Sequence, residues 1–297
     1  MAVRTVATAA IASGYDPAAN LATILDHVRE AADAGADLVV FPEQCLQGYL
    51  PSLTQYDLDH TTYQVDHAER LSDGEGIRAI AAAARRHRIH VVVGFTERDE
   101  WRPDVLFNSA AVIGPDGVIG AYRKVHQPGD EKHAYYPGED FVVFETAVGR
   151  IGVLICYDLV FPESTRSLAL ARADVLAMPT AWAVANPAVP VEQDRMTDYL
   201  ELFSRTRALE NQSWFLASNL VGPLGDFHYP GMSQIVAPDG SVRASTGCAA
   251  GLAVVTADLS SEVVRARTVG YLGYSFLKDY RPLTAARVSA MSPTEIS

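Results

Sequence analysis

The interleaving of short apolar runs with amphipathic stretches constrains the fold of this sequence more than any other feature. The apolar runs are bounded by Gly, Pro or charged residues, as is typical of buried strands. The predicted strands are 3–10, 37–41, 89–95, 106–113, 118–123, 141–145, 150–157, 174–178, 213–220, 233–237 and 252–257. The predicted helices, which carry apolar residues at helical spacing, are 17–34, 76–88, 162–171 and 196–209. This alternation predicts an α/β-type fold with large sheets and helices on the outside.

The connections between these elements predict one domain over residues 1–297, because no Ser/Gly-rich linker divides the chain. Two Pro-Asp-Gly turns, at 115–117 and 238–240, predict similar hairpins and hint at pseudo-symmetry. The polar stretch 44–73 is predicted to be irregular and to lie over a site. Pro179 is expected to end its strand. The tail from about 282 lacks a strong pattern and is expected to be extended or to lie at a subunit interface.

Charge and cysteine content exclude several classes of protein. The 297 residues carry a formal charge of −12, and no cluster of Lys and Arg occurs, which argues against a nucleic-acid partner. No apolar stretch of about eighteen residues occurs, which predicts no transmembrane helix and no membrane partner. The three cysteines are too far apart for a disulfide framework or a zinc site, and this favours a reducing, cytoplasmic compartment. The eight histidines show no spacing typical of metal ligands.

Three chemically capable side chains follow predicted strands, where α/β folds place their ligand sites. They are Glu43, Lys124 and Cys156. Cys156 lies between a strand and a helix, so its thiol is expected in a strained, exposed turn with the amide of Tyr157 facing an incoming carbonyl oxygen. Each residue also has an ordinary interpretation: a small buried hydrophobe for the cysteine, a cap or surface carboxylate for the glutamate, and a solvated hairpin residue for the lysine.

The segments around these residues resemble the Glu, Lys and Cys motifs of the carbon–nitrogen hydrolase, or nitrilase, superfamily, in the same order and separation. The segments are 41–49, 122–126 and 155–158. Further matching segments lie at 108–109, 136–138, 207–212, 231–233 and 279–282. The resemblance implies a four-layer αββα sandwich and a thiol mechanism without metal or cofactor. It implies Cys156 as the nucleophile, Glu43 as the general base, Lys124 as the stabiliser of the oxyanion and Glu131 in a positioning or proton-handling role.

The residues after the nucleophile position favour the amidase-like branch of that superfamily. The chain has Tyr157-Asp158, whereas nitrilases proper usually carry Trp-Glu there. It also lacks the arginine with which N-carbamoyl-amino-acid hydrolases hold a carboxylate, so a neutral or amine-bearing amide is favoured. Four residues are predicted to line the substrate pocket, with core or rim packing as the alternative. They are Tyr49, Tyr157, Trp182 and Ala183.

The leading functional hypothesis is therefore an amidohydrolase that cleaves a small linear amide through a cysteine thioester and releases ammonia or an amine. The alternatives are an N-carbamoyl-amine hydrolase, a nitrilase, or a catalytically silent binding scaffold on the same fold. The resemblance also implies a homodimer or a higher homo-oligomer. The helices at 162–171 and 196–209 are the candidate contact faces.

Overall fold

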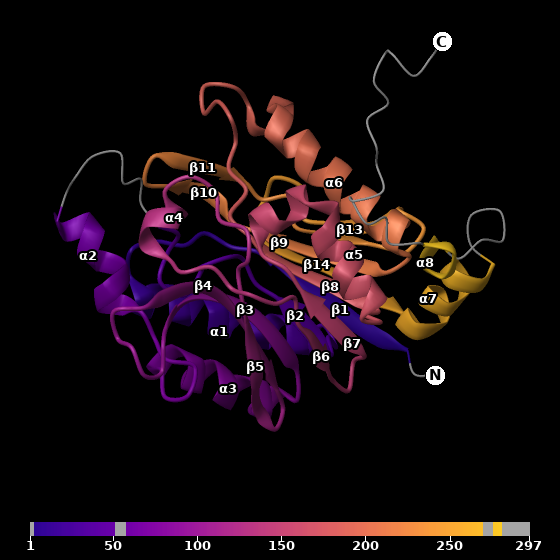
Figure 1. The fold of residues 1–297 in the computed structure, drawn as a ribbon, viewed down its shortest axis with the longest axis horizontal. Coiled ribbons are helices and arrows are strands. Elements are labelled where there is room, and N and C mark those ends of the chain that lie inside the picture. The colour runs from indigo at the N-terminus through magenta and orange to yellow at the C-terminus, as the bar shows by residue number, and fades with distance from the viewer. Residues whose placement is uncertain (1–2, 51–57, 270–275, 281–297) are drawn as a thin grey trace, which may run out of the picture.

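The computed structural model describes residues 3–50, 58–269 and 276–280 of the chain. In these residues two six-stranded sheets lie face to face, with helices covering the outer face of each (Figure 1). The first sheet has the order β14 (Gly251–Ala257), β1 (Arg4–Ala10), β2 (Leu38–Val40), β3 (His90–Arg98), β4 (Leu106–Gly114), β5 (Gly117–Arg123). The second has the order β13 (Val242–Ser245), β12 (Gln234–Val236), β9 (Trp214–Asn219), β8 (Val175–Thr180), β7 (Arg150–Val153), β6 (Val143–Glu145).

The remaining elements cover or cap these sheets. The helices are α1 (Pro17–Asp33), α2 (Leu58–His67), α3 (Glu75–His87), α4 (Glu131–Ala134), α5 (Pro162–Leu170), α6 (Arg195–Asn211), α7 (Leu259–Thr268) and α8 (Phe276–Asp279). Two 3₁₀ turns, η1 (Cys156–Val160) and η2 (Val191–Gln193), and the hairpin β10 (Val221–Leu224)–β11 (Phe227–Pro230) complete the described part. This arrangement confirms the predicted α/β-type, four-layer αββα sandwich.

Alternating side chains of the strands build two separate cores. On β1 and β2, Val6, Leu38 and Val40 point between the sheets, whereas Ala7 and Val39 point toward α1 and α3. This alternation is what a strand buried on both faces requires. The second sheet packs its other face against α5 and α6 in the same way. Both faces of each sheet are therefore covered, and the ends of the strands are the natural place for polar chemistry.

The two sheets repeat one topology. The first sheet is read from β14 and the second from β6. Each then shows one antiparallel strand pair, two parallel pairs and two antiparallel pairs. The two Pro-Asp-Gly hairpins, β4–β5 and β12–β13, occupy the same place in each sheet, as the repeated turn suggested. Glu43 follows β2, and Ala181 follows β8, the equivalent strand of the other sheet; the Ala181 N–H donates to the Glu43 carboxylate.

Several predicted boundaries were wrong. The strand expected over 150–157 ends at Val153, because η1 begins at Cys156. The stretch 44–73, expected to be irregular, contains α2, whose polar sequence has no strong apolar stripe. Pro179 lies within β8 rather than after it. The N–H that proline lacks would point toward β7, which has already ended, so no hydrogen bond is lost there.

Two further features bear on the sequence predictions. The tail from about 282 lies outside the described residues, and its expected role at a subunit interface stays a prediction. In the part of the chain that the structure describes, none of the helices has the length and apolar character needed to cross a bilayer.

Candidate functional site

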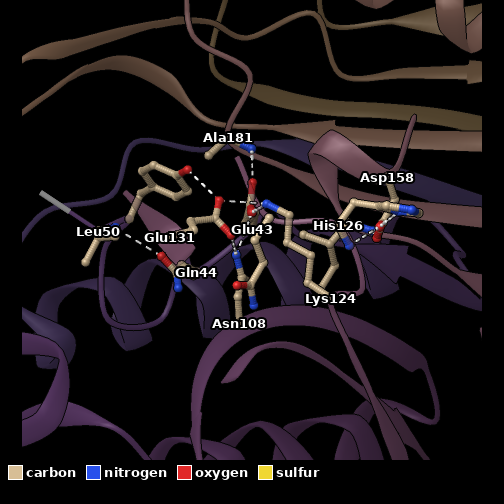
Figure 2. Close-up of polar contacts among 12 residues, drawn as sticks. Glu43, Gln44, Leu50, Asn108, Lys124, His126, Glu131, Asp158 and Ala181 are labelled. Atoms are coloured by element: carbon tan, nitrogen blue, oxygen red, sulfur yellow. Dashed lines mark hydrogen bonds and ion pairs between the residues drawn. The ribbon is translucent and has the colours of Figure 1, made fainter. Parts of the chain in front are cut away.

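A buried lysine between two glutamates forms the centre of the site. Lys124 follows β5, and its Nζ lies 2.6 Å from Glu43 Oε1 and 2.7 Å from Glu131 Oε1 (Figure 2). All three side chains are at most 1 % exposed. Glu43 comes from the loop after β2 and Glu131 opens α4, so three separate segments supply the three charges. The structure thus brings together three of the four residues predicted to be catalytic.

Further donors satisfy every oxygen of the two carboxylates. The Asn108 side-chain amide on β4 donates to Glu43 Oε1 at 2.7 Å and to Glu131 Oε2 at 3.1 Å. The backbone N–H of Ala181 donates to Glu43 Oε2 at 2.8 Å, and the hydroxyl of Tyr49 donates to Glu131 Oε1 at 2.7 Å. Buried carboxylates need such partners. These contacts therefore fix both glutamates in position on either side of the lysine.

Two glycines allow these segments to approach one another closely. A Cβ on Gly94 would lie 2.4 Å from the Pro42 carbonyl oxygen and 2.6 Å from Glu43 Cα. A Cβ on Gly138 would lie 2.1 Å from the Arg123 carbonyl oxygen, directly before the lysine. No side chain fits at either distance, so glycine is required where the backbone packs against the loops that hold Glu43 and Lys124.

Cys156, the fourth predicted residue, begins η1 in a left-handed conformation with φ of +44°. Its side chain is 7 % exposed. A non-glycine residue is strained in this region, and such strain is common at functional sites. The position matches the strained strand-to-helix turn predicted for a nucleophile, although the thiol is more buried than the sequence suggested.

Asp158 ties the Cys156 turn to the loop that carries the lysine. One oxygen of its buried carboxylate accepts hydrogen bonds from Ile155 N–H at 2.9 Å and from the Tyr122 hydroxyl at 2.6 Å. The other accepts from both the backbone N–H and Nδ1 of His126, each at 2.9 Å. His126 lies two residues after Lys124, so Asp158 joins the backbone before Cys156 to the segment that follows the lysine; Figure 2 shows Asp158 beside His126.

The charges of the cluster determine the protonation state of each group. Burial alone lowers the pKa of Lys124, but Glu131 and Glu43 outweigh it, and the pKa is raised so that the lysine stays charged. Burial also raises the pKa of Glu131, while Lys124 opposes this change. The pKa of Cys156 is raised by burial and then by the charge on Glu43; Lys124 and the nearby Thr180 hydroxyl oppose the rise without cancelling it.

A raised thiol pKa predicts that Cys156 is a neutral thiol in the free protein. Between about pH 7 and about pH 9, where an ordinary thiol ionises, the thiolate absorbance of the protein should not exceed that of a Cys156→Ala variant. Ultraviolet difference titration of the two proteins measures this directly. A thiolate signal that belongs to Cys156 near neutral pH would contradict the expected protonation state and would indicate a preformed thiolate–ammonium pair instead.

A cavity of about 400 Å³ opens beside the cluster. Tyr49 and Ala183, both predicted to line the substrate pocket, lie in its wall together with Glu131 and Ala181. The wall also contains Phe227 and Tyr229 from β11. Sequence reasoning missed these last two because the short β10–β11 segment has no clear strand pattern. Their aromatic character at 227 and 229, two residues apart, was the available signal.

The other two predicted pocket residues lie elsewhere. The indole N–H of Trp182 donates to the Met196 carbonyl oxygen at 2.8 Å, and its ring packs against Phe203 with centroids 6.2 Å apart. The Tyr157 ring packs edge-on against Phe161 at 5.4 Å. Neither is among the described residues that line the cavity, so these contacts favour the packing alternative, and their roles in substrate binding stay predictions.

The other two cysteines are not among the described residues that line the cavity. The Cys45 thiol is fully buried and lies 3.7 Å from the Gly94 carbonyl oxygen, whereas Cys248 is partly exposed near the surface. Within residues 3–50, 58–269 and 276–280, no three His, Cys, Asp or Glu side chains are grouped so that they could hold a metal ion. The expected absence of a metal or cofactor stays a prediction.

Comparison with known proteins points to one family. The sequence profile of the carbon–nitrogen hydrolase family matches residues 5–268. A probable nitrilase of Schizosaccharomyces pombe is 31 % identical over 267 residues, covering 89 % of this chain and 90 % of that protein. An (R)-stereoselective amidase of a Pseudomonas species is 30 % identical over 267 residues, covering 90 % and 87 %.

Solved structures show the same likeness. A variant of the amidase from Nesterenkonia sp. AN1, with glutamine in place of a glutamate, superposes with a TM-score of 0.74 and 26 % identity, covering 94 % of both chains. That structure is described as showing covalent addition of the acetamide moiety of fluoroacetamide at the active-site cysteine.

Proposed function

The chain belongs to the carbon–nitrogen hydrolase family, and from this premise we propose that it hydrolyses a small linear amide through a thioester on Cys156. Its membership makes it a hydrolase of amide carbon–nitrogen bonds; the thioester route and the substrate are the proposal. The observation that carries the proposal is the buried Glu43–Lys124–Glu131 cluster, whose charges act on the Cys156 thiol and whose Glu131 lies in the wall of the cavity.

The first half of the reaction begins with a neutral thiol. Cys156 Sγ attacks the amide carbon while its proton passes to Glu43, since the raised pKa of the thiol requires a base. The new S–C bond displaces the carbonyl π electrons onto oxygen. The Lys124 ammonium, held charged by its two carboxylates, and the Tyr157 N–H stabilise this oxyanion. The oxyanion then collapses, the C–N bond breaks, and Glu43 returns its proton to the leaving amine.

The second half removes the acyl group. Glu43 takes a proton from water as the water oxygen attacks the thioester carbon, and a second oxyanion forms at the same donors. The S–C bond breaks, the carboxylic acid leaves, and the proton returns to the thiol. Glu131 acts in this scheme as a positioning residue: it shares Lys124 with Glu43 and is itself held by Tyr49. Asn108 joins the two carboxylates and supports both.

The cavity supports a neutral or amine-bearing substrate. Its described wall carries two acidic residues, Asp130 and Glu131, and no Lys, Arg or His side chain. A substrate carboxylate would find no cationic partner there, and the charge of −12 would repel it at long range. The name of the Pseudomonas relative supports amide cleavage, while that of the yeast relative keeps nitriles as a second candidate substrate class.

A substrate panel tests the proposed function. The purified chain should release ammonia from linear amides, measured by a coupled assay across aliphatic and aromatic members. Carbon dioxide released together with ammonia would instead identify an N-carbamoyl-amine hydrolase, and turnover of nitriles a nitrilase. If amides, N-carbamoyl amines and nitriles are all left uncleaved while mass spectrometry shows an intact Cys156 thiol, enzymatic function at this site is contradicted. A catalytically inactive binding scaffold is then favoured.

We also propose that the chain forms a homodimer or a higher homo-oligomer through the outer layer of α5 and α6 (Figure 1). Several large apolar side chains are exposed on these two helices, as expected of a contact face. They are Leu170, Tyr199, Leu202 and Leu209. The cytoplasmic location favoured by the cysteine content likewise remains a proposal.

A further inference from the structure

The hydroxyl of Tyr229 is a buried polar group that lines the cavity without a hydrogen-bond partner among the described residues. Tyr229 is only 1 % exposed. A buried hydroxyl left unpaired keeps the full cost of its lost hydration, so such groups are normally satisfied. The hydroxyl of Tyr49, on the same wall, shows the contrast, because it donates to Glu131. A ligand that enters the cavity can supply the partner that Tyr229 lacks.

The position of Tyr229 is fixed by its hairpin and its aromatic neighbours. It pairs with Gly222 in the short β10–β11 ladder, and its ring lies 6.4 Å from that of Tyr49 and 6.2 Å from that of Phe227. Burial, and then the charges of nearby groups including Glu43 and Cys156, raises the pKa of Tyr229, so the phenol stays protonated. The hydroxyl is therefore a neutral group in the cavity wall that can donate or accept.

The chemistry around this hydroxyl favours an amino group. Asp130 and Glu131 are in the same cavity wall, and Glu131 shares the single cation Lys124 with Glu43, so two carboxylates are balanced by one ammonium and the local potential favours an ammonium over a carboxylate. The aromatic faces of the wall also attract a cation. Glu131 and Ala181, which bind Lys124 and Glu43, belong to this wall, so an acyl group held at the cluster extends along it.

On the basis of the function proposed above, we propose that Tyr229 is a specificity residue that binds an amino group on the acyl side of the substrate. The preferred substrates are then amides that carry an amine on the carbon next to the scissile carbonyl. An ammonium donates to the phenol oxygen, and a neutral amine accepts from the phenol O–H. An acyl chain with a methyl group at that point leaves the buried hydroxyl unpaired.

Three amides of similar size test this inference: alaninamide, isobutyramide with a methyl group in place of the amine, and lactamide with a hydroxyl. In the wild-type chain kcat/KM for alaninamide should exceed that for isobutyramide by about 10–100-fold, which corresponds to one hydrogen bond with a charged partner. In Tyr229→Phe this ratio should fall to near one, while kcat/KM for isobutyramide changes little. Tyr135→Phe is the matched control, because it removes a second buried hydroxyl that lies outside the cavity wall.

Each other outcome overturns the inference. No preference for alaninamide in the wild-type chain would refute it without any variant, and a preference for lactamide would assign the site to a hydroxyl. An equal fall in kcat/KM for alaninamide and isobutyramide in Tyr229→Phe would show that Tyr229 acts through packing. A lower melting temperature of the variant would then confirm the packing role. Cleavage of isobutyramide without selectivity leaves the proposed function standing, whereas failure on all three amides rejects both proposals.

Discussion

Replacing Cys156 with alanine should abolish amide hydrolysis, with kcat falling by roughly 10⁴-fold or more. Without the thiol no thioester can form, and the neighbouring charges can only polarise water weakly. The fold should survive, because the side chain removed is small. Its thiol has a raised pKa and is neutral, so its removal leaves no buried charge without a partner. Ammonia release under saturating substrate measures the loss, and far-ultraviolet circular dichroism checks the fold.

The other two cysteines are the controls for this prediction. Cys45→Ala should keep its activity, although removal of a fully buried thiol costs some stability. Cys248→Ala, at a partly exposed position, should change neither activity nor stability. Turnover by Cys156→Ala above a tenth of the wild-type rate would show that the reaction does not pass through this thiol.

The backbone at Cys156 adds a second measurement. At φ of +44° an L-residue is strained by about 1 kcal/mol relative to glycine. Cys156→Gly should therefore be as inactive as Cys156→Ala and about as stable, because the relief of strain offsets the about 0.4–1 kcal/mol that the greater freedom of glycine in the unfolded chain costs. A glycine variant less stable than the alanine variant by that full amount would mean that the turn carries no strain.

The sequence predicted those residues of the site that lie at strand ends within recognisable motifs. Glu43, Lys124 and Cys156 each follow a strand, and in a sandwich of two sheets those ends converge. Glu131 was predicted only through family resemblance, and it does contact Lys124. The layered fold followed from the alternation of strands and helices, because each apolar face must be covered by another layer.

The supporting contacts could not be predicted in this way. Asn108 joins Glu43 and Glu131 across a sequence separation of 65 and 23 residues, and Ala181 reaches Glu43 across 138. A backbone N–H has no signature in the sequence, and a buried asparagine resembles any other until its partners are known. Asp158 was read only as a marker of substrate class, whereas it links the two halves of the site.

The burial of three charges in one cluster has an energetic consequence for the whole fold. Two carboxylates within 2.7 Å of one ammonium are tolerable only because the cation compensates them. The cluster joins the loop after β2, the end of β5 and the start of α4, so its electrostatic balance is also a structural requirement. Lys124 therefore stabilises both the oxyanion and the resting protein.

Lys124→Met should lower kcat by at least about 10²–10³-fold, since one oxyanion donor is lost, and should destabilise the protein by about 3–5 kcal/mol near neutral pH, since the two glutamates lose their cation. In the variant the folded-state pKa values of these carboxyls rise above their unfolded values. The folded state then binds more protons, so its stability increases as pH falls. The difference in melting temperature from the wild-type chain should shrink as pH is lowered from about 7 to about 5.

Two comparisons separate electrostatics from packing in this variant. Lys132→Met makes the same substitution at an exposed position on α4 and should leave activity and melting temperature unchanged. The double variant Lys124→Met/Glu131→Gln removes one of the uncompensated carboxylates and should regain part of the lost stability without regaining activity. A melting-temperature deficit that stays constant with pH, or that Glu131→Gln does not relieve, would show that Lys124 contributes through its aliphatic chain rather than through its charge.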